Sequence, residues 1–168
     1  MKIIIIAIIL VFTGCFNVRT HDDIVADLTS QLNSMSISDL EHPDIEPSKY
    51  WSSFLYKYNI TKECYKADYG DDDYMRYPIE TITEKIFDCE DSAALAISCF
   101  GIEAFRYLIF GSKGTKGHTM SVFYLPERGE YKWILISNTS EISYKSEKHM
   151  LECQGKKYSE MSKIYYSR

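Results

Sequence analysis

The sequence lacks a basic excess and is poor in cysteine. Its 19 Lys and Arg residues are outnumbered by 24 Asp and Glu residues, giving a formal net charge of −5. This charge provides no electrostatic basis for binding nucleic acid. Five cysteines in 168 residues are too few for a disulfide scaffold, and no CxxC spacing predicts a zinc site. We therefore expect no nucleic-acid partner, no metal and no cofactor.

Internal repeats and low-complexity segments are also missing. Hydrophobic residues make up 45% of the chain and charged residues 26%, which is the balance of a folded globular protein. Aromatic residues reach 14%, and Tyr is the most frequent of them. The length fits one domain of ordinary size with its own hydrophobic core.

The longest apolar run is too short to span a membrane. Ten apolar residues, Ile3 to Phe12, follow Lys2, whereas a transmembrane helix needs about twenty. This length and its flanks are typical of a signal peptide, which we place at residues 1–14. The segment Phe12-Thr13-Gly14-Cys15 resembles a bacterial lipobox. That resemblance implies cleavage before Cys15 and acylation of Cys15, with residues 15–23 as a tether to the membrane.

The start of the chain therefore predicts an exported lipoprotein anchored to the bacterial cell envelope through Cys15. The alternative is an ordinary secretory signal with an incidental Cys15, in which case the protein is secreted or periplasmic. In both cases the domain itself is expected over residues 24–168.

The domain begins with helical patterns and continues with strand patterns. Apolar residues at helical spacing follow Asp22 and Asp23, which we expect to cap the first helix. The Gly-rich segment 111–117 is either a flap or a plain hairpin connection, and the tail 146–168 is expected to be charged and partly helical. The pattern predicts helices over 24–35, from 47 onward and over 88–101, then an aromatic and aliphatic stretch over 104–110, and strands over 118–125 and 131–136. Helices followed by an antiparallel sheet define an α+β fold.

Cys89 has the local context of a reactive thiol. Asp88 is a good N-cap residue, which places Cys89 in the first turn of the predicted helix 88–101. Unpaired N–H groups and the helix dipole stabilise a thiolate there. The acidic residues Glu90 and Asp91 oppose this effect. The plain alternative is that Cys89 is a small buried core residue.

His118 is the best candidate for the base that a nucleophilic cysteine requires. It opens a strand directly after the Gly-rich segment, where its ring can face a groove. A third group must accept the other ring N–H. The next strand ends in Ser137-Asn138, and we prefer Asn138 over Ser137 because an amide oxygen is the better acceptor. The predicted triad is Cys89, His118 and Asn138.

These residues resemble the transglutaminase-like cysteine protease superfamily. The resemblance rests on Tyr77-Pro78-Ile79-Glu80-Thr81, Asp88-Cys89-Glu90-Asp91, Gly117-His118 and Ser137-Asn138. It covers residues 74–142 and implies a papain-like core, in which a central helix carries Cys89 and packs on an antiparallel sheet. By this resemblance Cys89 attacks a carbonyl carbon, His118 moves the proton and Asn138 holds the ring. Tyr77 is a candidate second donor to the oxyanion, beside the Cys89 N–H.

The resemblance implies an extracytoplasmic cysteine peptidase, amidase or acyltransferase. Its partner is a protein or peptide substrate, which includes cell-wall peptides, and its product depends on whether water or an amine resolves the acyl-enzyme. The alternative is a catalytically inactive binding module of the cell envelope. Two departures favour this alternative, because Phe87 stands where Gly is common and no Asp is present as the third triad member.

Three further cysteines carry weaker expectations. Cys99 lies on the helix of Cys89 and is expected to be buried and inert. Outside the cytoplasm, Cys64 and Cys153 are the pair that a disulfide can join.

Overall fold

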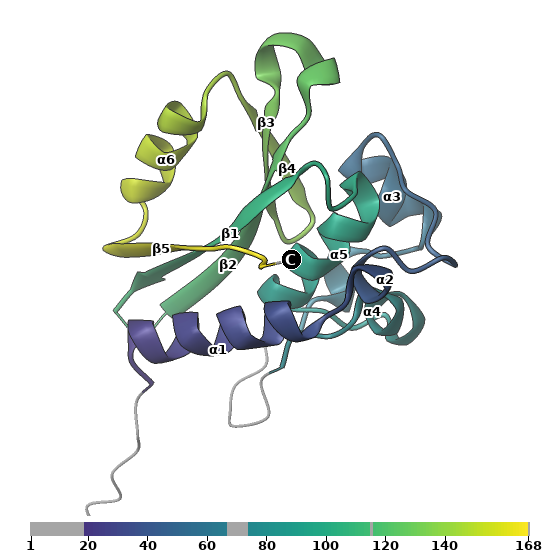
Figure 1. The fold of residues 1–168 in the computed structure, drawn as a ribbon, viewed down its shortest axis with the longest axis horizontal. Helices are drawn as coiled ribbons and strands as arrows, with labels where there is room; N and C mark the ends of the chain where they lie inside the picture. The colour runs from purple at the N-terminus through teal and green to yellow at the C-terminus, as the bar shows by residue number, and fades with distance from the viewer. Residues whose placement is uncertain (1–18, 67–73, 115, 168) are drawn as a thin grey trace, which may run out of the picture.

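The computed structural model describes residues 19–66, 74–114 and 116–167. A five-stranded antiparallel sheet with the order β4-β3-β2-β1-β5 forms its centre (Figure 1). The strands are β1 (Phe105–Lys113), β2 (Lys116–Tyr124), β3 (Trp133–Ser137), β4 (Ser140–Tyr144) and β5 (Glu160–Ile164). The predicted α+β class with an antiparallel sheet is confirmed.

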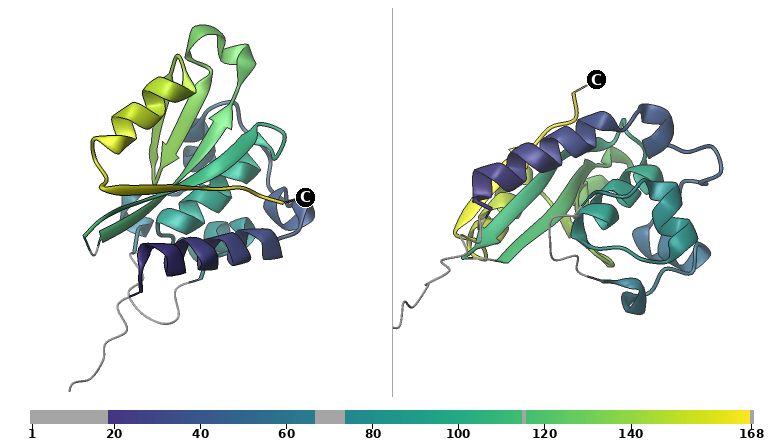
Figure 2. Two further views of the ribbon diagram at one scale, coloured as in Figure 1. Left: turned by 60° about the vertical axis from the view of Figure 1, so that its left-hand side comes forward. Right: turned by 90° about the horizontal axis from the view of Figure 1, so that it is seen from below.

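Helices cover both faces of the sheet (Figures 1 and 2). One face packs against α1 and α5, and the other packs against α6. The helices are α1 (His21–Ser34), α2 (Ile37–Leu40), α3 (Trp51–Lys57), α4 (Pro78–Glu84), α5 (Cys89–Phe100) and α6 (Glu147–Gly155), with 3₁₀ turns η1 (Lys62–Cys64) and η2 (Pro126–Tyr131). This arrangement gives two hydrophobic cores, one on each side of the sheet.

The two cores follow from the alternation of side chains along each strand. On β2, Phe123 joins the core beneath α5, whereas Met120 and Val122 join the core beneath α6. On β3, Ile134 and Ile136 face α5 and Leu135 faces α6. Neighbouring residues in a strand therefore point to opposite sides of the molecule, and this rule decides which side chains can meet at the site.

The start of α5 is fixed by a buried capping arrangement. The Asp88 side chain accepts the N–H of Asp91, and the Asp91 side chain accepts the N–H of Asp88, at 3.2 Å each. The Arg76 guanidinium also donates to Asp91 at 2.6 Å. Asp91 is completely buried. Because a buried carboxylate needs such partners, this cluster holds the first turn of α5 in place.

Three boundaries differ from the sequence prediction. Helix α1 starts at His21, because Thr20 is the N-cap and Asp23 completes the capping box. The end of the predicted tether, from residue 21, is therefore helical. The predicted loop 111–117 is mostly strand, since β1 and β2 pair as far as Lys113 and Lys116. Its role as a flap stays a prediction.

The tail contributes more structure than its sequence predicts. Besides the expected helix α6, it supplies the edge strand β5, which pairs with β1 from Leu108 to Ser112. Strand β5 is short and charged, and it lies at the edge of the sheet with a strand neighbour on one side only. Such a strand gives only a weak hydrophobic pattern in the sequence. Its pairing with β1 places the preceding loop, 156–159, above the hairpin end of the sheet.

The cysteines of the described residues are free thiols, and Cys64 and Cys153 do not pair. Cys64 packs against the core beneath α5 and Cys153 against the core beneath α6, so the sheet separates them. Cys99 is buried as expected, and burial raises the pKa of its thiol to about 12. The signal peptide 1–14 and Cys15 lie outside the described residues. Within those residues, each helix is too short or too polar to cross a membrane.

We predict that Arg76→Leu destabilises the protein by about 3 kcal/mol, because it leaves the buried Asp91 carboxylate without its ion pair. Urea unfolding followed by circular dichroism measures this free energy. The matched control is Arg106→Leu at an exposed arginine, which should cost less than about 1 kcal/mol. Equal losses in the two variants would contradict the structural role of Arg76.

Candidate active site

The candidate site lies where the pairing between β2 and β3 stops. The register ends at Ser121 opposite Ile136, and its continuation would place Thr119 opposite Asn138. Strand β3 ends at Ser137, and Asn138 adopts a left-handed backbone with φ 53°. The chain turns away at that point, so the Thr119 N–H has no partner on β3. This N–H must find another acceptor.

The Cys89 sulfur is that acceptor. The Thr119 backbone donates a hydrogen bond to the sulfur, which lowers the pKa of Cys89, although the larger effects oppose it. Cys89 is the first residue of α5 and is half-buried. The sulfur therefore lies beside the backbone of the residue that follows His118. The sequence prediction that α5 carries Cys89 at its N-terminus agrees with this placement.

His118 is oriented by Ser137. The Nε2 atom of its ring and the Ser137 hydroxyl are 2.8 Å apart. In the register of β2 and β3, these two residues are diagonal neighbours on the same face. No hydrogen bond joins His118 to Cys89 among the described residues, and the thiol instead donates to Glu90 at 3.0 Å.

The preferred assignment of Asn138 as the group that holds His118 does not match this geometry. Asn138 follows the last residue of β3 in a left-handed conformation, and no hydrogen bond joins its side chain to His118 among the described residues. Its carbonyl oxygen accepts hydrogen bonds from Ser92 on α5 and from the Trp51 indole. Its side-chain Oδ1 is buried and has no hydrogen-bond partner among the described residues. Asn138 therefore anchors the turn to α5, and Ser137 is the residue that contacts His118.

Electrostatics favour a neutral thiol and a neutral imidazole. Burial raises the pKa of Cys89 well above its ordinary value, and the Glu90 carboxylate raises it further. Burial also lowers the pKa of His118, with a smaller contribution from the Lys157 charge. Both shifts disfavour a thiolate–imidazolium pair. At neutral pH, the neutral His118 can accept a proton while Cys89 attacks.

Tyr77 and Phe87 are two other residues that the sequence analysis singled out. Tyr77 is the N-cap of α4, where its backbone N–H donates to Glu80, and no hydrogen bond joins it to Cys89 among the described residues. Phe87 is buried and packs edge-on against Tyr65. Phe87 and Ser137 both line a cavity of about 320 Å³, together with Lys62, Tyr65, Asn138, Thr139 and Ser140. Phe87 is thus part of a cavity wall next to the site.

The sequence analysis missed Lys157 and Tyr158, which reach the site from the loop between α6 and β5. The Tyr158 ring lies on Gly111, because a Cβ atom at Gly111 would be 2.6 Å from that ring. Gly111 pairs with His118 across β1 and β2. The loop 156–159 therefore lies close to His118. Its contacts are long-range, and no local sequence signal predicts them.

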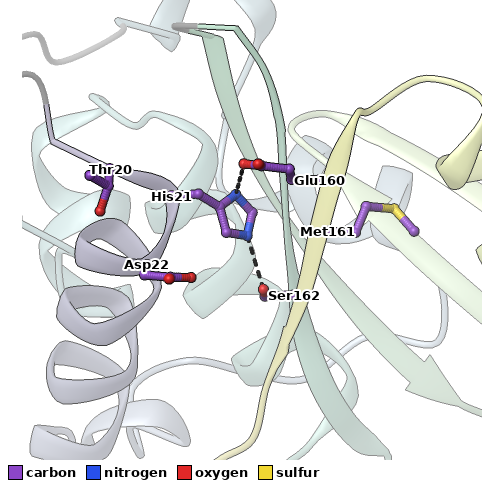
Figure 3. A pocket seen from close by; sticks show the side chains of 6 residues that line it. All are labelled: Thr20, His21, Asp22, Glu160, Met161 and Ser162. Carbon is purple, nitrogen blue, oxygen red and sulfur yellow. Dashed lines mark hydrogen bonds and ion pairs between the residues drawn. The ribbon is translucent and has the colours of Figure 1, made fainter.

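A second cavity, of about 460 Å³, lies where α1 meets β5 (Figure 3). His21 is at its centre, with Nδ1 2.7 Å from the Ser112 hydroxyl and Nε2 2.9 Å from the Ser162 hydroxyl. The Glu160 carboxylate is 3.5 Å from the same Nδ1. Because both ring nitrogens have partners, this histidine fastens the start of α1 to the sheet.

The described residues hold no group of three or more His, Cys, Asp or Glu side chains that fits a metal ion. The candidate site consists of a thiol, an imidazole and hydroxyl groups, which are the components of nucleophilic catalysis. No protein-family model matches the chain, and neither does a curated protein or a solved structure.

We predict that Glu90→Gln speeds alkylation of Cys89 by iodoacetamide. Removing the carboxylate charge lowers the pKa of Cys89 and increases its thiolate fraction, by about tenfold for each pKa unit. Peptide mass spectrometry at about pH 8 measures the rate for each cysteine.

The matched control is Glu152→Gln beside Cys153, which should leave the Cys89 rate unchanged. Cys99 should remain unlabelled in every variant unless the protein unfolds, because it is buried. An unchanged or slower Cys89 rate in Glu90→Gln would show that Glu90 does not hold the thiol in its protonated form.

Proposed function

We propose that the protein is a thiol-dependent enzyme that cleaves or transfers acyl groups at amide bonds. The observation that carries this proposal is the hydrogen bond from the Thr119 N–H to the Cys89 sulfur, which places the thiol at the backbone of the residue that follows His118. The order of elements supports it, since a helix that begins with the nucleophile precedes the strand that carries the base. We further propose that this arrangement is a papain-like or transglutaminase-like core.

In the proposed reaction, the Cys89 sulfur adds to a carbonyl carbon while His118 accepts the thiol proton. The C–N bond then breaks, and the departing amine takes that proton from His118. Water or a second amine next attacks the thioester, with His118 acting again as the base. Ser137 keeps the imidazole in place through its hydrogen bond to Nε2. Because the resting pair is neutral, His118 acts as a general base during the attack.

The proposed substrate is a protein or peptide that contacts the cavity beside Ser137. Its wall combines the aromatic rings of Tyr65 and Phe87 with the polar side chains of residues 137–140 and the ammonium group of Lys62. This lining suits a peptide with a polar side chain. We propose that the protein is exported and anchored through acylated Cys15, which would bring cell-wall peptides within reach.

The second candidate function is a catalytically inactive binding module on the same fold. The contact between the Cys89 thiol and the Glu90 carboxylate favours it, because that contact keeps the thiol protonated. In this case the cavity at residues 137–140 would bind a peptide without reacting with it. Acylation chemistry separates the two candidates.

We expect p-nitrophenyl acetate to acylate Cys89 and to release p-nitrophenol in a burst. Cys89→Ser should abolish the thioester adduct, and His118→Ala should slow acylation by about 100-fold or more, since a general base contributes about that much. Stopped-flow absorbance and intact-protein mass spectrometry measure both effects. Cys153→Ser is the matched control at another half-buried thiol and should behave like the parent. Absence of an adduct at Cys89, with the protein folded, would favour the binding module.

We also expect Ser137→Ala to slow the acylation of Cys89 more than Asn138→Gly does. Ser137 holds the His118 ring, whereas glycine at position 138 keeps the left-handed backbone that the turn requires. The measured quantity is the burst rate constant for each variant. A larger decrease of the burst rate constant in Asn138→Gly would show that Asn138, and not Ser137, orients His118.

A further inference from the structure

The cavity of about 320 Å³ beside Ser137 carries a positive charge on its wall. The charge belongs to the ammonium group of Lys62, and none of the residues that line the cavity is an Asp or a Glu. This contrasts with the whole chain, in which 24 acidic residues outnumber 19 basic ones. Because an unbalanced positive charge attracts an anion, the wall favours a negatively charged ligand over a neutral one.

The charge of Lys62 is not neutralised by the protein. Lys62 is exposed and makes no ion pair among the described residues. Its chain neighbour Glu63 is held mainly by a hydrogen bond from the Thr61 side chain, and the charge of Lys62 has a smaller effect on the pKa of Glu63. Lys62 is therefore available to a ligand in the cavity.

The turn between β3 and β4 adds hydroxyl groups to the same wall. Thr139 and Ser140 form no side-chain hydrogen bond among the described residues. The acceptor of their neighbour Asn138, its Oδ1 atom, is buried. An ammonium group and two hydroxyl groups can all donate hydrogen bonds to one ligand. A carboxylate fits this set, because it only accepts hydrogen bonds and carries the charge that Lys62 favours.

Hydrogen bonds hold both sides of the cavity in place. On one side, the Lys66 N–H donates to the Phe87 carbonyl at 2.9 Å, and the Phe87 N–H donates to the Cys64 carbonyl at 3.2 Å. These two bonds fasten the segment 62–66 to the residue before the N-cap of α5. On the other side, the Asn138 carbonyl accepts a hydrogen bond from α5 at 2.8 Å. The cavity is therefore formed before a ligand binds.

The cavity also lies next to the candidate site. Phe87 on its wall precedes Cys89 by two residues, and Ser137 on its wall is 2.8 Å from the His118 ring. A volume of about 320 Å³ is small for a ligand site and suits one side chain or the end of a peptide. The rings of Tyr65 and Phe87 supply apolar contacts for the carbon atoms beside a carboxylate.

We propose that this cavity binds a carboxylate of the peptide substrate through the Lys62 ammonium group and the hydroxyl groups of Thr139 and Ser140. The inference rests on the proposed function, since it names the substrate class of that site. The carboxylate belongs either to an acidic side chain or to the end of the peptide, and both have the same chemistry. In either case, the amide bond that reacts with Cys89 lies close to a negative charge in the substrate.

The test measures the binding of three short peptides to the parent protein by NMR titration at low salt. Acetyl-Ala-Glu-Ala-amide has an acidic side chain, and acetyl-Ala-Gln-Ala-amide is its neutral counterpart. Acetyl-Ala-Gln-Ala with a free carboxyl end has its charge at the terminus. We expect a charged peptide to bind about tenfold more tightly than the neutral one, as for a hydrogen bond to a charged group. The charged peptide that binds more tightly identifies the source of the carboxylate.

Three variants locate the carboxylate in the cavity. Lys62→Met should bring the Kd values of the charged and neutral peptides within about twofold, because it removes the only charge of the wall. Lys66→Met is the matched control, at an exposed lysine of the same segment that does not line the cavity, and should keep the preference. Thr139→Val should reduce the preference by about threefold through the loss of one donor.

Three results would overturn the inference. The first is equal binding of charged and neutral peptides to the parent, or no detectable binding of any of them. The second is a preference that Lys62→Met leaves intact. The third is a preference that Lys62→Met and Lys66→Met reduce equally, because the carboxylate would then respond only to the general charge of the surface.

Acylation by p-nitrophenyl acetate separates this inference from the proposed function. If Cys89 is acylated but the charged and neutral peptides bind equally, only the carboxylate site fails. If Cys89 is not acylated and the charged peptides still bind through Lys62, the enzymatic function fails. The cavity is then the carboxylate site of a binding module.

Discussion

The N-terminus of α5 occupies the place that β3 leaves when it turns away from β2 at Ser137. The Thr119 N–H, freed by the end of the ladder, binds the Cys89 sulfur. The buried cluster of Asp88, Asp91 and Arg76 holds the helix start in that position. The site therefore depends on an interruption in the sheet.

The environment of the thiol keeps Cys89 and His118 in their neutral forms in the free protein. Burial and Glu90 keep Cys89 protonated, and burial keeps His118 neutral. A nucleophile of this kind avoids exposing a reactive thiolate and relies on proton transfer during the attack. Stabilisation of the developing oxyanion then becomes more important, because no preformed ion pair supplies reactivity.

Local signals in the sequence predicted the local features correctly. Asp88 and the acids after it predicted the start of α5 at Cys89, and the alternation after Gly117 predicted the strand of His118. The choice between Ser137 and Asn138 required the register of β2 and β3 to within one residue, because a shift of one residue reverses the face. Tyr158 and strand β5 depend on contacts between the tail and β1. Such contacts leave no periodic pattern in a short charged segment.

The central claim is that His118 serves Cys89 as a general base. The most direct measurement is the pH dependence of the acylation rate of Cys89 by p-nitrophenyl acetate, in the parent and in His118→Ala. The account predicts a rise with pH whose midpoint lies below 6.5, the ordinary pKa of histidine, and which disappears in the variant. A rate that rises only with thiolate formation well above neutral pH, equally in both proteins, would contradict it.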